Sequence, residues 1–381
     1  MRITVNASTL VVGGGIQIGI SFIQEVIKNT DIEWQFIVSK GIYNEIGSEI
    51  IKNKNIHCID KPPAKIFSGA KSRKKIKYLV NIFKPDLVYS IGFPSYINFK
   101  QKEIGRYTNP WEINTGPLPW NLYSSLWSKL KILLGIKYRQ YWAKKAFIIE
   151  TQTDAAKIGI SKRLGFSENR IIKIPNSANH LFVSQIDKYR NTFNNKFIFS
   201  LAAPYKHKNI QVIPDVLYIL KNKYNLSPQF YLTIPENAEI WKSVVKRSKE
   251  LEVENLIVNL GKISLNQCLD YYLKAKIVFL PTLMEIFSAT YIEAMAMGVP
   301  IVTNDMDFAR DNCGNAALFC DSDNIEDYAY NIYRLWHDQT LHNILVERGY
   351  EHLSKYPSIH EKYQMIYEMF YKIKATNHSL V

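Results

Sequence analysis

The sequence predicts an α/β protein made of two Rossmann-like domains, each a doubly wound parallel sheet. Its 381 residues exceed one ordinary domain of roughly 100–200 residues. Short apolar runs rich in β-branched residues alternate with helical segments, which is typical of parallel sheets covered by helices on both faces. Residues 277–304 (IVFLPTLMEIFSATYIEAMAMGVPIVTN) form the clearest strand–helix–strand unit, because Gly298–Pro300 ends the helix before the second apolar run.

The first domain is expected to open with a strand, a glycine-rich turn and a helix. The strand is Arg2–Asn6 and the helix spans Ile16–Lys28. Consecutive glycines let a backbone approach a phosphate closely. The dinucleotide fingerprint is not met, since Gly19 lies one place too late. A phosphate or acceptor contact and a simple tight turn therefore both remain open for Gly13, Gly14 and Gly15.

The remaining elements follow the same alternation. Further strands of the first domain are expected at Trp34–Val38, Ile56–Ile59, Asp86–Ile91, Glu103–Thr108, Ala146–Thr151 and Ile171–Ile174. The polar stretch Ser184–Asn195 is interpreted as a linker. Strands of the second domain are expected at Phe197–Leu201, Gln229–Ile234 and Leu256–Leu260, and helices at Ala238–Glu250, Leu265–Ala275, Ile325–Trp336, Leu341–Leu353 and Ser358–Ala375.

The chain is basic, with 48 Lys and Arg against 34 Asp and Glu, a net charge of +14. This charge predicts an anionic partner. Nucleic acid is disfavoured because the sequence contains no recognised binding module. Residues 65–84 and 119–145 combine lysines with aromatic residues, as helices at an anionic membrane surface do. The alternative is ordinary helices whose aromatic side chains face the core.

Other features narrow the class of protein. The four cysteines form no CxxC pair, so neither a zinc site nor a redox motif is expected. We find no signal peptide and no apolar run of about 18 residues. The prediction is a cytoplasmic protein, peripheral to the inner face of the cytoplasmic membrane if the basic segments bind lipid. We expect no metal ion and no cofactor, and the sequence leaves the oligomeric state open.

Two glutamates in the 277–304 unit are candidates for chemistry. Glu285 lies in the loop and Glu293 lies two turns into the helix, so joint action as a glycosidase pair is disfavoured. Separate roles fit better, with one carboxylate on a sugar and the other on a ribose diol. The amides of Ile286, Phe287, Ser288 and Ala289 are available to a diphosphate at the helix start.

A second candidate segment follows the strand Phe197–Leu201. Lys206, His207 and Lys208 precede a helix that is expected to begin near Asn209 as its N-cap, although Pro214 favours a later start. A lysine at this place can neutralise charge on a leaving diphosphate. The alternative is a group of solvated loop cations.

These motifs resemble the family 4 retaining glycosyltransferases, which have the GT-B architecture. The matching pieces are VVGGGIQ, IIKIPNSAN, KHKN, NLGKIS and the 277–304 unit with the following Asp305. The resemblance covers most of the chain and is strongest from Lys196 to Asp321. It implies an acceptor domain over residues 1–185, a nucleotide-sugar domain over 186–357, and a last helix, 358–381, that returns to the first domain.

The resemblance also implies roles for single residues. Glu285 would lie near the donor sugar, Glu293 on the ribose and Lys208 on the diphosphate, while Gly261 and Lys262 would line the nucleotide pocket. Two departures are visible. Ala202 and Ala203 stand where the family has an arginine, which leaves Lys206 as a substitute of different geometry. The histidine that the family often carries after the fifth strand is absent, because that position reads Tyr107, Thr108 and Asn109.

The predicted function is transfer of a sugar from a nucleoside diphosphate to an acceptor hydroxyl with retention of configuration. The expected partners are a nucleotide sugar and a carbohydrate or lipid-linked glycan, in bacterial surface-polysaccharide assembly such as O-antigen, capsule or lipopolysaccharide. Two alternatives remain open. One is a GT-B nucleotide-sugar epimerase, and the other is a non-catalytic protein that binds sugar nucleotides or polysaccharide.

Overall fold

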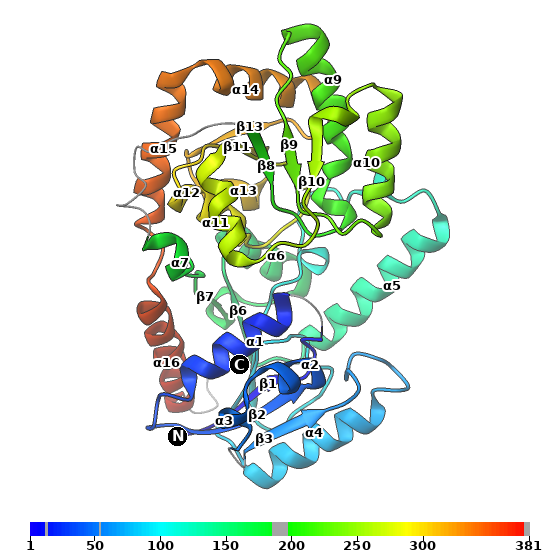
Figure 1. Cartoon of the computed structure of the whole chain (residues 1–381). Helices are drawn as coiled ribbons and strands as arrows, with labels where there is room; N and C mark the ends of the chain where they lie inside the picture. The colour runs from blue at the N-terminus through cyan, green and yellow to red at the C-terminus, as the bar shows by residue number, and fades with distance from the viewer. Residues whose placement is uncertain (12–13, 53–54, 185–196, 377–381) are drawn as a thin grey trace. The chain divides into compact units, whose positions relative to one another are not determined.

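A computed structural model describes residues 1–11, 14–52, 55–184 and 197–376 (Figure 1). The chain divides into two compact units, each with its own sheet. Unit 1 contains Met1–Pro117, Ser125–Ile174 and Glu361–Val381, and unit 2 contains Leu118–Ser124 and Pro175–His360. The predicted linker lies outside the described residues, except for Ser184.

Unit 1 is built on a seven-stranded parallel sheet with the order β3-β2-β1-β4-β5-β6-β7. The interior strand β1 is buried almost throughout, and Val5 lies between Phe36 of β2 and Tyr89 of β4. The strands are β1 Arg2–Ala7, β2 Glu33–Ser39, β3 Ile56–Ile59, β4 Leu87–Ser90, β5 Lys102–Arg106, β6 Ile148–Thr151 and β7 Ile171–Lys173.

The helices of unit 1 cover both faces of this sheet, as the continuous apolar strands require. They are α1 Gly14–Val26, α2 Lys40–Glu45, α3 Ser48–Ile51, α4 Ala70–Phe83, α5 Leu126–Ala143, α6 Asp154–Leu164 and α16 Ile359–Ala375, with short 3-10 turns at Pro110–Glu112 and Glu168–Arg170. Helix α16, the last in the chain, buries Ile366, Met369, Phe370 and Ile373 in the core beside β1, β2 and β4. Lys102 on β5 also donates to the carbonyl of Ile373 over 3.2 Å.

Unit 2 has a six-stranded parallel sheet with the order β10-β9-β8-β11-β12-β13. The strands are β8 Phe197–Ser200, β9 Phe230–Leu232, β10 Ile257–Asn259, β11 Ala275–Leu280, β12 Ile301–Asn304 and β13 Ala317–Cys320. The helices are α7 His180–Val183, α9 Ile213–Tyr224, α10 Glu239–Glu250, α11 Leu265–Lys274, α12 Ala289–Ala296, α13 Asp307–Cys313, α14 Ile325–His337 and α15 Gln339–Leu353. Short 3-10 turns occupy Trp120–Leu122, Lys206–Lys208, Ile210–Val212 and Glu254–Leu256.

Three local expectations are corrected by the structure. Helix α9 begins at Ile213 instead of Asn209, because Pro214 occupies its first turn, where a missing N–H costs nothing. Asn209 is not an N-cap of this helix and has a left-handed backbone, with φ of 56°. The helix expected across 119–145 is two elements, the 3-10 turn Trp120–Leu122 and helix α5. Helix α13 and strand β13 were not predicted.

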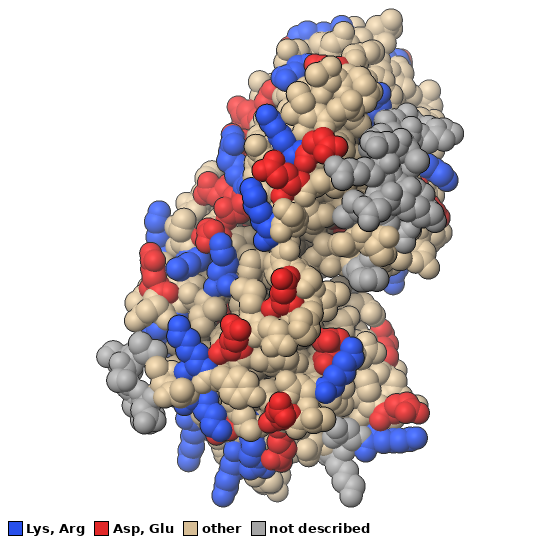
Figure 2. Space-filling view, turned by 90° about the vertical axis from the view of Figure 1, so that its left-hand side faces the viewer, with Lys and Arg blue, Asp and Glu red and all other residues tan. Residues whose placement is uncertain are grey.

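Charged side chains of both signs are interspersed on the face shown in Figure 2, where no single cationic patch dominates. The net charge of +14 therefore says little about where an anion would bind. Among the described residues, no helix combines the length and the apolar character that crossing a membrane requires.

One buried carboxyl in unit 1 makes stability depend on pH. Burial raises the pKa of Glu103 to about 7, against 4.5 for an exposed glutamate, although the Ser90 hydroxyl donates to its carboxylate over 2.6 Å. The folded state therefore holds this proton more tightly than the unfolded state. The resulting stabilisation is complete below about pH 4.5 and is lost as the pH rises through 7.

We expect Glu103→Gln to remove this contribution while keeping an acceptor for Ser90. The difference in unfolding free energy between wild type and variant should change by about 3 kcal/mol from pH 4.5 to pH 8. Urea denaturation at several pH values measures it. Parallel pH profiles of the two proteins would contradict the buried, protonated carboxyl.

Candidate active site

The candidate site of unit 2 lies where the strand order reverses. From β8, the chain adds β9 and β10 on one side and then crosses to add β11, β12 and β13 on the other. Strands β8 and β11 are paired neighbours, with Ile277 opposite Ile198 and Val278 opposite Phe199. Doubly wound folds bind ligands at the carboxyl ends of strands at such a reversal, and the loops that follow β8 and β11 leave the sheet there.

The two loops carry a partly buried ion pair at this place. The Lys208 ammonium contacts the Glu285 carboxylate directly, and the two side chains are only 14% and 17% exposed. The loops are also joined through the backbone, since the Leu283 amide donates to the His207 carbonyl over 2.8 Å. The structure therefore brings together a cation and a carboxylate that were proposed from separate motifs.

The Lys208 loop has a compact geometry of its own. Lys206–Lys208 form a 3-10 turn, which ends where Asn209 takes its left-handed conformation. The His207 ring stacks on Tyr205 at 5.5 Å between centroids. Burial, assisted by the nearby Lys208 charge, lowers the pKa of His207 to about 4, so His207 is neutral at pH 7. The cationic character of this loop therefore comes from its lysines.

Lys206 is directed to a different partner. Its ammonium donates to the Leu122 carbonyl over 3.1 Å and lies 5.1 Å from the centroid of the Tyr123 ring. These contacts attach the segment Leu118–Ser124 to unit 2. The idea that Lys206 substitutes for the missing arginine beside Lys208 is therefore not supported by any direct contact with Glu285 in the structure.

The start of helix α12 offers hydrogen-bond donors beside Glu285. Ser288 is the N-cap residue, and its side chain makes no capping bond. Within the described part of the chain, no group accepts from the amides of Phe287, Ser288 and Ala289. Free amides at a helix start, together with the helix dipole, form an anion-binding arrangement. The Ile286 side chain is buried and instead packs in the core.

Glu293 has a separate environment on the second turn of α12. Its side chain is buried, and the Tyr272 hydroxyl of α11 donates to it over 3.1 Å. Burial raises the pKa of Glu293 to about 7. The carboxyl is therefore poised between its neutral and ionised forms at neutral pH, whereas Glu285 is engaged with a lysine. The two glutamates thus have different partners and different electrostatic surroundings.

Gly261 and Lys262 follow strand β10. Gly261 has φ of 63°, a left-handed conformation that favours glycine, and its amide donates to the Asn259 side chain over 3.2 Å. The same Asn259 side chain pairs with both backbone groups of Ile234 after β9. Lys262 is exposed. Asn259 thus positions this edge of the sheet, a role that was not predicted.

Asn304 is a second positioning residue that sequence reasoning missed. Its buried amide donates to the carbonyls of Pro281 and Thr282, over 2.9 and 3.0 Å. It thereby holds the loop that carries Glu285. The sequence feature that could have identified Asn304 is a polar residue at the end of the apolar run 301–304.

The acceptor-side residues lie in unit 1. Gly14 and Gly15 form the first turn of α1, and Gly13 lies outside the described residues. Thr108 is exposed, whereas Asn109 accepts from the Trp111 amide over 3.2 Å and caps a 3-10 turn. Among the described residues, no charged side chain is paired with Gly14, Gly15, Thr108 or Asn109. Among the residues that the structure describes, no group of three His, Cys, Asp or Glu side chains could hold a metal ion.

Several known proteins are similar to this chain in sequence. Residues 184–352 match the family of group 1 glycosyl transferases. The O-antigen chain mannosyltransferase RfbU of Salmonella typhimurium is 24% identical over 180 residues, which are 47% of this chain and 48% of that protein. An uncharacterized glycosyltransferase of Haemophilus influenzae is 29% identical over 154 residues, 40% of each chain. The matched regions thus span about half the length of these curated relatives.

Solved structures resemble the whole chain. Sucrose-phosphate synthase from Thermosynechococcus elongatus aligns with a TM-score of 0.75 at 13% identity, covering 99% of this chain and 100% of that one. Anabaena HepE, solved in complex with UDP and glucose, aligns with a TM-score of 0.69 at 14% identity, covering 98% and 100%. The predicted fold class is confirmed: the chain has the GT-B fold of two Rossmann-like units, and its residues 184–352 match the group 1 glycosyl transferases.

Proposed function

We propose that this protein is a retaining glycosyltransferase of family 4 that transfers a hexosyl group from a nucleoside-diphosphate sugar to an acceptor hydroxyl. The observation that carries the proposal is the Lys208–Glu285 pair beside the open amides of α12, at the strand reversal of unit 2. This arrangement offers a cation and backbone donors to a diphosphate, and a carboxylate to sugar hydroxyls.

Donor binding would rearrange this pair. A diphosphate carries more negative charge than one carboxylate and competes with Glu285 for the Lys208 ammonium. Glu285, once released, is free to accept hydrogen bonds from the donor sugar. Glu293 would accept from the ribose, and Gly261 and Lys262 would line the nucleotide pocket.

In the transfer step, the bonds that form and break and the proton that moves all belong to the donor and the acceptor, so no base from the enzyme is needed. The bond from the anomeric carbon to the diphosphate oxygen breaks, and its electron pair leaves with that oxygen. The acceptor hydroxyl oxygen forms a new bond to the anomeric carbon on the same face, and its proton passes to a phosphate oxygen of the leaving group. Lys208 and the amides of Phe287, Ser288 and Ala289 would stabilise the departing diphosphate. No metal and no cofactor enters this proposal.

The proposed setting is surface-polysaccharide assembly in a bacterial cytoplasm. It is supported by the likeness to an O-antigen mannosyltransferase and by the UDP and glucose bound to a structural neighbour. The proposed acceptor is a carbohydrate or a lipid-linked glycan.

Donor binding and turnover can be tested with two substitutions. We expect one class of nucleotide sugar, in a thermal-shift panel of UDP, GDP, ADP and CMP sugars, to raise the melting temperature.

Lys208→Ala should weaken binding of the matching nucleoside diphosphate by about tenfold or more, because a charge-assisted contact is lost. Calorimetry measures this, with the exposed Lys242→Ala as the control.

Glu285→Gln should keep a partner for Lys208 and lower transfer to an acceptor by about 100-fold or more. Unchanged transfer would refute the role of Glu285. Conversion of the donor into its epimer without an acceptor would identify an epimerase, and binding without turnover would identify a non-catalytic relative.

The pKa of Glu293 predicts how donor affinity depends on pH. Ribose hydroxyls donate to the ionised carboxylate, which becomes predominant as the pH rises through about 7. Affinity should increase up to tenfold from pH 6 to pH 8 in the wild type relative to Glu293→Gln. Comparing the two proteins removes the titration of the nucleotide itself. Equal slopes in both proteins would argue against a ribose contact of Glu293.

We also propose that α5 of unit 1 rests on an anionic membrane surface. The helix is apolar on both sides. Ile136 and Ala143 are buried, Tyr138 stacks on Tyr96, and yet Leu126 and Trp127 are 82% and 79% exposed. The other members of the exposed ridge, at helical spacing, are Leu130, Leu133, Leu134 and Tyr141, and Lys131, Lys137, Lys144 and Lys145 accompany it. An exposed apolar ridge with lysines beside it is typical of a helix that lies on anionic lipid.

Flotation with vesicles tests this proposal. Wild type should float with vesicles that contain phosphatidylglycerol and much less with pure phosphatidylcholine, and salt should weaken the binding. Replacing Trp127 and Leu134 by serine should abolish flotation. Tyr330→Ser, an exposed aromatic on α14 of unit 2, is the matched control. Absence of wild-type binding at low salt, or equal loss in the control, would refute the membrane contact.

A further inference from the structure

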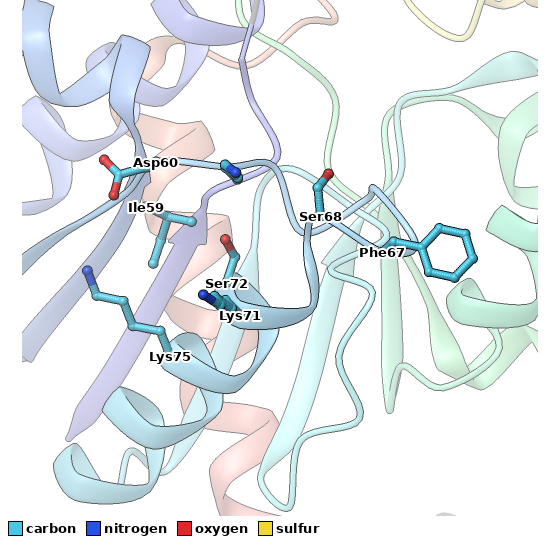
Figure 3. A pocket seen from close by; sticks show the side chains of 8 residues that line it. Ile59, Asp60, Phe67, Ser68, Lys71, Ser72 and Lys75 are labelled. Atoms are coloured by element: carbon cyan, nitrogen blue, oxygen red, sulfur yellow. The ribbon is translucent and has the colours of Figure 1, made fainter.

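A hollow in unit 1 lies where strand β3 gives way to helix α4. Strand β3 ends at Ile59 and α4 begins at Ala70, and the chain between them curves around a cavity of about 360 Å³. Figure 3 shows this hollow from close by. Its polar lining consists of Asp60, Lys61, Ser68, Lys71, Ser72 and Lys75.

The hollow has a positive charge that no neighbour balances. Three lysines line it against the single carboxylate of Asp60. In the described part of the chain, Lys61, Lys71 and Asp60 form no ion pair. Lys75 donates to the Cys58 carbonyl over 3.0 Å, which holds its ammonium at the rim. An anion that enters therefore meets cations that have no competing carboxylate in direct contact.

Ser72 provides an independent sign of a ligand. Its side chain lies in the first turn of α4 and the residue is only 8% exposed. No described residue donates to or accepts from its hydroxyl. In Figure 3 this hydroxyl points out of the helix toward the segment that carries Asp60 and Ser68. The hydroxyl therefore remains available to a ligand in the hollow, from which it can accept or to which it can donate a hydrogen bond.

The backbone at the start of α4 is open in the same direction. The N-cap residue is Gly69, which has no side chain to cap the helix. A Cβ atom at this position would lie 2.4 Å from the Lys65 carbonyl oxygen, so Ser, Thr, Asp and Asn do not fit. Within the described residues, the amides of Lys71 and Ser72 have no acceptor. This end of a 14-residue helix therefore keeps donors available for an anion.

Arg73 makes the hollow rigid. Its guanidinium donates to three carbonyls of the preceding loop, those of Pro63, Lys65 and Ile66, over 2.6, 2.8 and 2.5 Å. Arg73 is thus a positioning residue, because these contacts hold the loop in the form that surrounds the hollow. Donors that are fixed before binding lose little entropy when a ligand arrives.

We propose that this hollow is a binding site for a phosphate group. Phosphate oxygens can accept together from the two free amides, the Ser72 and Ser68 hydroxyls and the lysine ammonium groups. Asp60 weakens the site by repulsion. Exposed Ile66 and Phe67, 57% and 91% accessible, adjoin it and suit an apolar group attached to the phosphate. The site lies in unit 1 and is independent of the proposed donor site in unit 2.

Inorganic phosphate is the first probe. Calorimetric titration of the full chain should show saturable binding, which Lys71→Gln and Ser72→Ala should each weaken by about fivefold to tenfold. Lys74→Gln, a neighbouring exposed lysine on α4 outside the hollow, should change the affinity less than about twofold. Asp60→Asn should tighten binding, because it removes the opposing charge. Circular dichroism of each variant verifies the fold.

Vesicles separate the two sources of the phosphate. Phosphatidylcholine vesicles with phosphatidic acid test a lipid headgroup, and glucose 1-phosphate tests a soluble phosphorylated sugar. A loss of vesicle binding in Lys71→Gln and Ser72→Ala but not in Lys74→Gln assigns the lipid, whereas the same pattern with the sugar phosphate assigns the soluble ligand. The proposal is overturned if phosphate does not saturate the folded protein up to about 20 mM. It is equally overturned if Lys74→Gln weakens binding as much as Lys71→Gln.

Discussion

The pairing of β8 with β11 is the constraint on which the candidate site depends. Lys208 and Glu285 are 77 positions apart, and they meet because the strand order reverses between the two strands that precede them. The free start of α12 follows the second of these strands and therefore lies at the same edge of the sheet. Without this reversal, the lysine, the carboxylate and the helix amides would be three ordinary surface features. With it, they form one group of charges and donors at the same edge of the sheet.

Burial then gives the two glutamates of this unit different chemistry. Glu285 is paired with Lys208, and a more highly charged ligand can replace its carboxylate as the partner of the lysine. Glu293 accepts from the Tyr272 hydroxyl, and burial raises its pKa because it penalises the charge. Neutral contacts fix the neighbouring backbone: Asn304 holds the loop that carries Glu285, and Asn259 holds the segment that follows β9. A polar frame of this kind lets charged groups change partners while the backbone stays in place.

Unit 1 repeats the strand order of unit 2, but its candidate binding features lie away from the strand reversal. The loops after β1 and β4 are tied together at the reversal, where the Thr9 hydroxyl donates to the Gly92 carbonyl over 2.6 Å. The distinctive features lie outside that point, in the open start of α4 and the exposed apolar ridge of α5. A lysine-lined hollow and an apolar-basic helix are both suited to a ligand that is part phosphate and part hydrocarbon.

The sequence by itself determined the fold class and most elements, because continuous β-branched runs and well-punctuated helices are local properties. Strand Ile56–Ile59 has the limits that were predicted. The family resemblance also selected Lys208, Glu285 and Glu293 as a group. Only the tertiary structure decided which of these residues meet and how they ionise. It placed Glu285 against Lys208, turned Lys206 toward Leu122, and buried Glu293. It also left the Ser72 side chain without a partner among the described residues and Trp127 exposed. Contacts, burial and pKa values depend on residues brought together from distant parts of the chain, and a linear pattern does not contain that information.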